Sequence, residues 1–183
     1  ATTLRRQLVR QGSIFQSTSD TETIIHLVAT SSYRTLLDRF IDALRKIEGA
    51  YSLICLTAEG LIAVRDPLGI RPLVLGRLND AYIVASETCA LDIVGATFLR
   101  SLEPGELVVI SERGIQSHKP FAPTRPRPCI FEHVYFARPD SITDGRSVYE
   151  IRKRIGAQLA IESGVDADIV VPVPDSGTPA AIG

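Results

Sequence analysis

The sequence has few cysteines, and the three it has lie far apart. Cys55, Cys89 and Cys129 do not stand at the C-x-x-C spacing of a redox or zinc site. They therefore indicate no disulfide framework. The three histidines are scattered as well, and none pairs with another at the spacing of metal ligands.

A strong net charge and a long hydrophobic run are also missing. Lysine and arginine number 20 against 21 aspartate and glutamate residues, and the net charge is −1, whereas a nucleic-acid binder would carry a basic face. No apolar run approaches the roughly 20 residues that span a bilayer. The N-terminal stretch ATTLRRQLVRQG is charged and amphipathic, unlike a signal peptide. These absences predict a cytoplasmic protein that binds neither nucleic acid nor membrane.

The sequence does contain a stretch of four strand-like runs between Gly49 and Leu91. The runs are short, rich in β-branched and aromatic residues, and separated by turn residues; they are Tyr51–Thr57, Leu61–Val64, Leu73–Leu75 and Tyr82–Ala85. We predict an antiparallel meander from this pattern.

The loop in the middle of this stretch holds Arg65, Asp66 and Arg71. These residues could clamp a substrate or form an internal ion pair. The ion pair is the preferred interpretation, because bidentate Arg–Asp pairs can fix the geometry of tight turns. Ser86-Glu87, after the fourth run, is interpreted as structural, because no histidine stands nearby in the sequence to activate the serine.

Helices are predicted around the four runs. Apolar spacing predicts them at Thr2–Gln11, Tyr33–Ile47 and Thr88–Val94. A further helix should begin after Ser19, which forms a capping box with Glu22. Asp20 would then occupy the first helical position, where it could either bind a ligand's ammonium group or complement the helix dipole.

A proline-rich connector at residues 119–128 is the best candidate for a domain boundary. The runs before it, Leu107–Ile110 and Ile115–His118, predict a hairpin. Beyond the connector come the apolar run Ile130–Phe136, a long helix at Val148–Ser163 and a buried-strand run at Asp168–Val173. Strand, helix and strand in this order predict the opening of a parallel α/β sheet.

A turn of small polar residues follows the last of these runs. Asp175, Ser176, Gly177 and Thr178 stand between the predicted buried strand and a helix start. Backbone N–H groups at such a turn can bind a phosphate group.

Several of these motifs resemble one family. RDPLGIRPLVLG and ASETCALD resemble the signature of class II glutamine amidotransferases, and STSDTE resembles their glutamine-gripping segment. Asparagine synthetases carry comparable versions. PCIFEHVYFARPDSITDGRSVYEIRKRIG and VVPVPDSG, however, resemble the glutamine phosphoribosylpyrophosphate amidotransferases, whereas an asparagine synthetase would have an ATP-pyrophosphatase loop there.

The resemblance implies a fold and a domain organisation. Residues 1–125 would form the second half of a glutaminase domain of the N-terminal-nucleophile hydrolase fold, an α+β sandwich of antiparallel sheets with helices. Residues 126–183 would begin an α/β type I phosphoribosyltransferase domain. The family's N-terminal cysteine nucleophile and Asn-Gly oxyanion hole match nothing from Ala1 onward, so we expect this fragment alone to be inactive.

The resemblance also implies a reaction. A cysteine thiolate would release ammonia from glutamine, and ammonia would displace pyrophosphate from phosphoribosylpyrophosphate to give 5-phosphoribosylamine, the first step of purine synthesis. Asp20 would hold the glutamine α-amino group, residues 175–178 the pyrophosphate, and Tyr149 would line the ammonia passage. The resemblance further implies Mg²⁺ as a cofactor, feedback inhibition by purine nucleotides, and assembly into a homo-oligomer, namely a tetramer.

Three alternatives remain open at this point. Some members of the family hold a [4Fe–4S] cluster, and Cys129 aligns with the first of its ligands. Such a cluster needs four thiolates. We therefore prefer to interpret Cys129 as a buried structural thiol and not as a cluster ligand. The chain could instead come from another class II amidotransferase, such as a relative of asparagine synthetase. It could also be a non-catalytic regulatory homologue that has lost the nucleophile.

Overall fold

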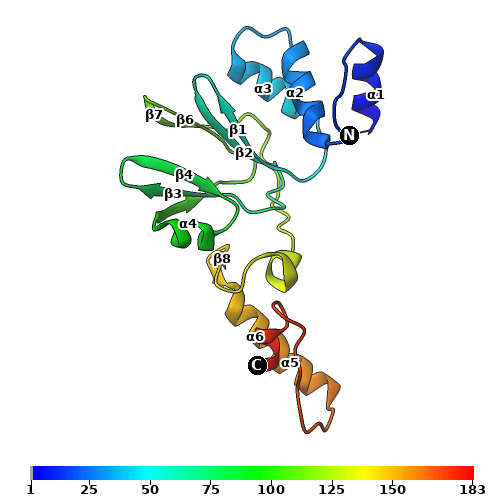
Figure 1. Cartoon of the computed structure of the whole chain (residues 1–183), viewed down its shortest axis with the longest axis vertical. Coiled ribbons are helices and arrows are strands. Elements are labelled where there is room, and N and C mark those ends of the chain that lie inside the picture. The colour runs from blue at the N-terminus through cyan, green and yellow to red at the C-terminus, as the bar shows by residue number, and fades with distance from the viewer. Residues whose placement is uncertain (1) are drawn as a thin grey trace. The chain divides into compact units, whose positions relative to one another are not determined.

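The computed structural model describes residues 2–183 of the chain (Figure 1). Ala1 lies outside the described residues. The family's nucleophile is expected at a position before Ala1, so the structure does not test it. The chain divides into two compact units, one ending at Gly49 and one spanning Ala50–Gly183. This division does not test the predicted boundary between residues 125 and 126, which stays a prediction.

The first unit consists of helices, drawn in blue shades in Figure 1. They are α1 (Thr2–Arg10), α2 (Asp20–Thr30) and α3 (Leu36–Arg45). Leu8, Leu27 and Ala43 form their common core. All three predicted helices are confirmed, but α3 begins later than predicted because Thr35 caps it: the Thr35 Oγ1 accepts a hydrogen bond from the Asp38 N–H (3.1 Å).

The second unit contains two larger antiparallel sheets and one two-stranded sheet, described below. The first has the order β1-β2-β6-β7 and the second β4-β3-β5. The strands are β1 (Ser52–Thr57), β2 (Gly60–Arg65), β3 (Val74–Leu78), β4 (Ala81–Ala85), β5 (Thr97–Ser101), β6 (Leu107–Ser111) and β7 (Gly114–His118). The hairpin at β6 and β7 is confirmed. The single meander is wrong: its four strands form, but β2 pairs with β6 and β3 with β5, so the loop between β2 and β3 passes from one sheet to the other.

The two sheets pack face to face around an apolar core. Ala63 of β2 and Val108 of β6 meet Leu73, Leu75 and Leu102 there, all almost fully buried. Neighbouring residues of a strand point to opposite faces. Thus β3 buries Leu75 between the sheets and the preceding valine on its outer face.

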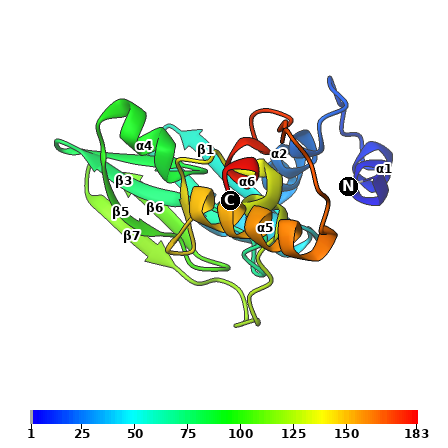
Figure 2. The same ribbon diagram turned by 90° about the horizontal axis from the view of Figure 1, so that it is seen from below.

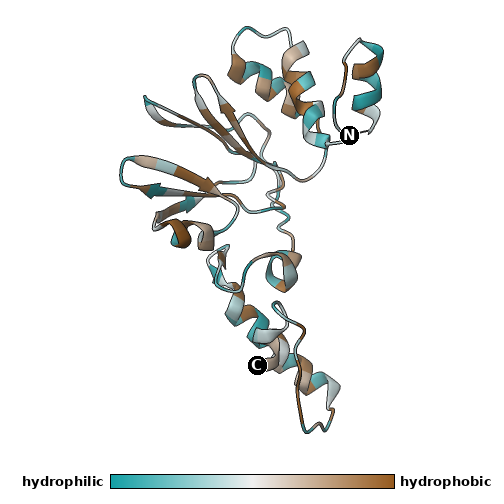
Figure 3. Cartoon of the chain, viewed as in Figure 1, coloured by the Kyte–Doolittle hydropathy of each residue, from teal (hydrophilic) through white to brown (hydrophobic). Residues whose placement is uncertain are grey.

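The outer face of the second sheet is covered by α4 (Thr88–Val94), the strongly apolar helix coloured brown in Figure 3. Val74 of β3 packs there against Leu91 and Ala96. The helix ends at Gly95, whose left-handed backbone (φ 73°) suits glycine. The helix forms at the predicted bounds, and together with the paired sheets it gives the expected α+β sandwich.

The segment after the connector differs from the prediction. Ile130–Phe136 was expected to be a strand, but Glu132–Phe136 forms a π-helix, η1. Its hydrogen bonds are local, such as that from the Ala137 N–H to the Glu132 carbonyl oxygen (3.1 Å), so its backbone pairs with no strand. A short hairpin follows, β8 (Ile142–Thr143) and β9 (Arg146–Ser147), whose two turn residues both have positive φ angles.

Helix α5 (Val148–Ser163) forms at the predicted bounds, and α6 (Thr178–Ile182) lies along it in both views of the chain (Figures 1 and 2). The helices approach so closely at Gly156 that a Cβ atom there would come within 1.8 Å of the Ala180 carbonyl oxygen. None of the helices in residues 2–183 is both long and apolar enough to cross a membrane.

The strand predicted at Asp168–Val173 does not form. The segment has no regular structure, and Ile169 and Val171 are 76% and 80% exposed. A buried parallel strand needs neighbours on both sides, and no strand within residues 2–183 pairs with this segment. Of the predicted strand–helix–strand unit only the helix is present, and the α/β phosphoribosyltransferase domain stays a prediction.

Candidate functional site

The start of α2 carries the predicted glutamine-binding residue, Asp20. Ser19 caps the helix by accepting a hydrogen bond from the Thr21 N–H (3.3 Å). Asp20 is the first helical residue and is exposed, and no hydrogen bond or ion pair within residues 2–183 uses its carboxylate. The helix start therefore leaves this charge free for a ligand.

The acid that organises this turn is Glu22. Its carboxylate accepts hydrogen bonds from the N–H groups of Gln16 (2.7 Å) and Ser17 (2.8 Å) and from the Ser17 hydroxyl (2.7 Å). These bonds lower the pKa of Glu22 to about 2, and the bond from the Gln16 N–H has the largest effect. The helix start is confirmed, but the reciprocal capping box is wrong: Ser19 caps α2 through the Thr21 N–H, and Glu22 accepts from Gln16 and Ser17 and not from the Ser19 N–H.

The loop between β2 and β3 is built on two buried charged side chains. Arg65 donates three hydrogen bonds to backbone carbonyl oxygens: Nε–H to Arg71 (2.8 Å), Nη2–H to Gly69 (2.9 Å) and Nη1–H to Leu102 (2.8 Å). Asp66 is fully buried and accepts from the N–H groups of two later loop residues, at 2.9 and 3.1 Å. Both side chains thus shape the loop, as predicted, by binding its backbone.

The predicted ion pair within this loop is wrong. The ion pairs among residues 2–183 include none between Asp66 and an arginine. Arg71 instead pairs with Glu132 of η1, and its guanidinium lies 4.6 Å from the ring centroid of Phe136. Burial raises the pKa of Glu132, and the charge of Arg71 opposes that effect. Arg71 therefore joins the loop to the chain beyond the connector.

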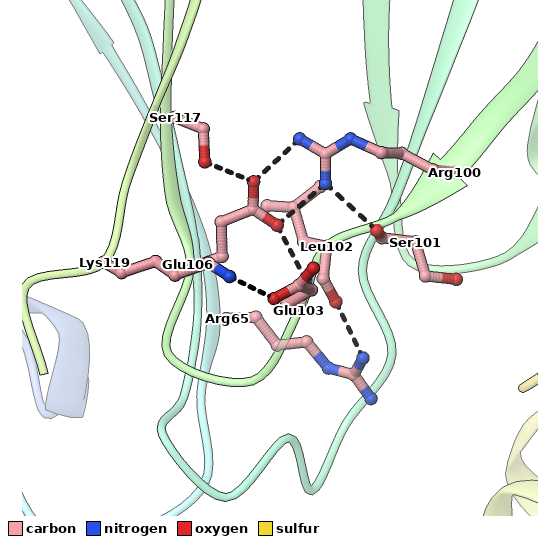
Figure 4. Close-up of polar contacts among 8 residues, drawn as sticks. All are labelled: Arg65, Arg100, Ser101, Leu102, Glu103, Glu106, Ser117 and Lys119. Carbon is pink, nitrogen blue, oxygen red and sulfur yellow. Dashed lines mark hydrogen bonds and ion pairs between the residues drawn. The ribbon is translucent and has the colours of Figure 1, made fainter. Parts of the chain in front are cut away.

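A second polar centre, which the sequence did not reveal, joins the two sheets (Figure 4). Glu106 is 2% exposed and accepts from Arg100 Nη2–H (2.7 Å) and Nη1–H (2.8 Å), from the Ser117 hydroxyl (2.6 Å) and from the Glu103 N–H (2.7 Å). Burial alone would raise the pKa of Glu106, but these hydrogen bonds outweigh it and lower the pKa to about 2. The only signal in the sequence is an acid placed directly before a buried strand.

Ser86-Glu87, interpreted as structural from the sequence, contains a third such centre. Glu87 stands at the N-cap of α4 but does not cap it. Its Oε2 accepts from the Arg138 N–H (2.7 Å) and the Ser141 hydroxyl (2.7 Å). The Cys89 thiol lies 3.7 Å from the same oxygen, and burial raises the pKa of this thiol. Nothing in the local sequence indicates these partners, which lie 51 and 54 positions later.

The remaining predicted site residues lie in the second unit, after the connector. Cys129 is half-buried with a free thiol, and its N–H donates to the Ile70 carbonyl oxygen (3.0 Å). Tyr149 is half-buried in the first turn of α5. No group of three or more His, Cys, Asp or Glu side chains within residues 2–183 is arranged to hold a metal ion.

The predicted phosphate-binding turn forms as a turn. Asp175 and Thr178 are exposed, and Ser176 and Gly177 are half-buried. The N–H of Gly177 donates to the Val173 carbonyl oxygen (3.0 Å) and that of Thr178 to the Asp175 carbonyl oxygen (3.3 Å). Two of the expected phosphate donors are therefore engaged within the turn itself.

Comparison with known proteins settles the family. A model of the glutamine amidotransferase domain matches residues 1–92, half of the chain. The chain belongs to the glutamine amidotransferase domain family. The matched region contains the exposed Asp20 and the loop built on Arg65 and Asp66, and it ends within α4.

Similarity to particular amidotransferases extends over the whole chain. It is 55% identical to an amidophosphoribosyltransferase of Rhizobium etli, over 99% of this chain and 38% of the relative, and 54% identical to a chloroplastic one of Glycine max, over 94% and 30%. The structure matches glutamine phosphoribosylpyrophosphate amidotransferase from Bacillus subtilis, complexed with ADP and GMP, with TM-score 0.94 and 48% identity over 99% of this chain and 40% of that one.

These matches confirm the expected resemblance to phosphoribosylpyrophosphate amidotransferases and the N-terminal-nucleophile hydrolase fold. The chain spans only about a third to two fifths of the length of the relatives it matches. Because the similarity continues past the connector to the C-terminal end, a relative of asparagine synthetase is not favoured.

Proposed function

We propose that this chain is part of an enzyme that makes 5-phosphoribosylamine from glutamine and phosphoribosylpyrophosphate. The observation that carries the proposal is the match at 48% identity to the Bacillus subtilis amidotransferase, which covers the segments on both sides of the connector. A relative that shared only the glutaminase part would match on one side alone. By the same similarity, purine nucleotides would act as feedback inhibitors, because the matched structure is complexed with ADP and GMP.

Asp20 is proposed to bind the α-amino group of glutamine. The support is its exposed carboxylate at the start of α2, which has no partner within residues 2–183, whereas Glu22 performs the local structural role. A carboxylate that faces an ammonium group forms a charge-assisted contact, which orients the substrate without taking part in bond breaking. The side-chain amide of glutamine would then be presented to the nucleophile.

The turn at 175–178 is proposed to bind pyrophosphate, and Tyr149 to line the path of ammonia. Pyrophosphate would have to replace the internal contacts of the Gly177 and Thr178 N–H groups. Asp175 is the one carboxylate in the turn. A single carboxylate is compatible with a Mg²⁺ ion that is bound mainly by the phosphate oxygens of the substrate. When bound, the ion would neutralise charge on the leaving pyrophosphate. The homo-oligomer stays a prediction.

An iron–sulfur cluster stays the less favoured interpretation of Cys129. Such a cluster needs four thiolates. Cys89 is buried in α4 and Cys55 lies in β1, so Cys129 is the one cysteine of this chain at an expected ligand position. No step of the proposed reaction depends on a cluster. The compartment also stays a prediction, since the Glycine max relative is named chloroplastic.

The proposal is tested by kinetics of Asp20→Asn in the full-length protein. Loss of one side of a carboxylate–ammonium contact costs about 2–5 kcal/mol, so the KM for glutamine should rise by about 30-fold to several thousand-fold. Ammonia-dependent synthesis should stay unchanged, because ammonia bypasses the glutamine site.

The matched control is Asp38→Asn, which changes another first-turn acid of the same helical unit. This variant should leave both activities intact. A wild-type protein that releases no pyrophosphate from phosphoribosylpyrophosphate with either nitrogen source would refute the proposed function. Equal loss of both activities in Asp20→Asn would refute the role of Asp20.

A further inference from the structure

The residues from Glu132 to Ser141, here called the junction segment, are held from three directions. They link the connector to the hairpin before α5. The segment has little regular structure beyond the single turn of η1. Its position therefore depends on side chains that reach it from elsewhere.

The first contact comes from the start of α4. Glu87 accepts hydrogen bonds from the Arg138 N–H and the Ser141 hydroxyl, both at 2.7 Å. The neighbouring Thr88 Oγ1 accepts from the Ile142 N–H (2.8 Å). Ser141 is 1% exposed, so its hydroxyl has no water to replace Glu87 as acceptor. These bonds fix the end of the junction segment on the sheet–helix layer.

The second contact comes from α5. Arg152 is 3% exposed, and it donates from Nε–H to the His133 carbonyl oxygen (2.7 Å) and from Nη2–H to the Ala137 carbonyl oxygen (2.8 Å). Burial lowers the pKa of Arg152, and the charge of Glu87 opposes that effect. The buried guanidinium is thus held by backbone oxygens of the junction segment and by the field of Glu87.

The third contact is Arg71, from the loop between β2 and β3. It pairs with Glu132 at the start of the junction segment and lies over the ring of Phe136. Glu132 is 3% exposed, whereas the Arg71 side chain is 45% exposed, so the acid is buried while its partner keeps contact with water. The loop that Arg65 and Asp66 shape is therefore joined to the same segment.

The junction segment in turn sets the first turn of α5. The Val148 N–H donates to the Ser141 carbonyl oxygen and the Tyr149 N–H to the Pro139 carbonyl oxygen, both at 3.0 Å. A continuous path of short hydrogen bonds runs from Glu87 through Ser141 to the residues that begin α5. Networks of hydrogen bonds and packed side chains of this kind can carry coupling between two sites.

We propose that Glu87 is a positioning residue that, through the junction segment, holds the first turn of α5 and Tyr149 in register with the glutaminase sheets, so that ammonia made at one site reaches the other without loss. This inference rests on the proposed function. It assigns Glu87 no contact with substrate. Its effect is on the coupling between the two reactions and not on either reaction alone.

The test compares glutamate release with pyrophosphate release in the full-length protein. With glutamine and phosphoribosylpyrophosphate present, Glu87→Ala should release about 5-fold or more glutamate per pyrophosphate than wild type, the lower end of typical coupling between sites. Its ammonia-dependent rate should stay close to that of wild type. Glu59→Ala, an exposed acid in the turn between β1 and β2, is the matched control and should change neither quantity.

A second pair of variants covers the case in which Glu87→Ala does not fold. Glu87→Gln keeps one acceptor oxygen, and Ser141→Ala removes one donor, so each breaks part of the contact. Both should raise the glutamate-to-pyrophosphate ratio by a smaller factor. An unchanged ratio in all folded variants would overturn the proposal, because a purely structural contact affects stability and not the ratio.

Hydrogen exchange separates this inference from the proposed function. If wild type has no pyrophosphate-releasing activity, the proposed function fails, but the positioning role can still be judged. Substitution of Glu87 should then speed exchange of the Val148 and Tyr149 N–H groups while those of α4 stay protected. Unchanged exchange of the Val148 and Tyr149 N–H groups would overturn the positioning role as well.

Discussion

Glu106→Gln would remove the charge at the centre of the polar cluster that joins the two sheets, and its effect can be worked out from the structure. Four hydrogen bonds lower the pKa of this buried carboxyl from an ordinary value of 4.5 to about 2. Each pKa unit corresponds to 1.36 kcal/mol, so the charge contributes about 3 kcal/mol at neutral pH. Arg100 is 42% exposed and regains water in the variant, so we expect a loss of about 2–3 kcal/mol.

The pH dependence has a definite sign. Because the folded-state pKa lies below the ordinary value, the stabilisation is complete above about pH 4.5 and is lost as the pH falls toward 2. Urea unfolding of wild type and Glu106→Gln, followed by circular dichroism at pH 7 and pH 3, should show a difference that shrinks with acidity. The matched control is Glu112→Gln, an exposed acid in the turn between β6 and β7, which should be neutral.

Two results would refute this reasoning. An equal loss of stability at pH 7 and pH 3 would mean that Glu106 acts by packing and not by charge. No loss of stability at pH 7 would mean that the four hydrogen bonds only offset the desolvation cost of burying the carboxylate. A double-mutant cycle with Arg100→Ala separates the two, because only a charge-based contribution requires coupling between Glu106 and Arg100.

Two further predictions concern the loop and the helix pair. Asp66→Ala leaves two loop N–H groups without an acceptor and should cost about 3 kcal/mol of unfolding free energy in urea titrations, with glutamine KM unchanged in the full-length protein; a large KM effect at normal stability would assign Asp66 to the substrate. Gly156→Ala would place a Cβ 1.8 Å from the Ala180 carbonyl oxygen and should displace α6, speeding hydrogen exchange of the Ala181 and Gly183 N–H groups; unchanged exchange would contradict the close packing of α5 and α6.

Local signals in the sequence predicted the helices well. Both α4 and α5 form at their predicted bounds, because the apolar spacing and the glycine that follows each helix, Gly95 and Gly164, are local signals. The pairing of β2 with β6 could not be predicted in the same way, since it depends on contacts more than 40 positions apart. The run Ile130–Phe136 misled for a related reason: its aromatic and β-branched residues suit a strand, but Arg71 and Arg152 hold it as a turn.

The candidate site was predicted unevenly. Asp20 stays a predicted binding residue: the capping pattern and the family resemblance both point to it, and its carboxylate is exposed. Ser86-Glu87 was correctly interpreted as structural, but the partners of Glu87 could not be predicted, and Glu106 was missed altogether. The donors around each of these acids lie elsewhere in the chain. The Arg–Asp ion pair was expected in the loop because bidentate Arg–Asp pairs can fix tight turns, yet Arg65 and Asp66 each bind backbone groups instead.

The three hydrogen bonds of Arg65 have a consequence for how this loop can evolve. All of its acceptors are backbone carbonyl oxygens, so the guanidinium holds the path of the chain without regard to the side chains along it. Exposed loop positions can therefore drift among related sequences while the shape persists. Lysine cannot replace this arginine at equal benefit, since its single ammonium centre cannot serve three acceptors that a planar fork reaches together. We therefore expect related sequences to keep this arginine while the exposed positions of the loop vary.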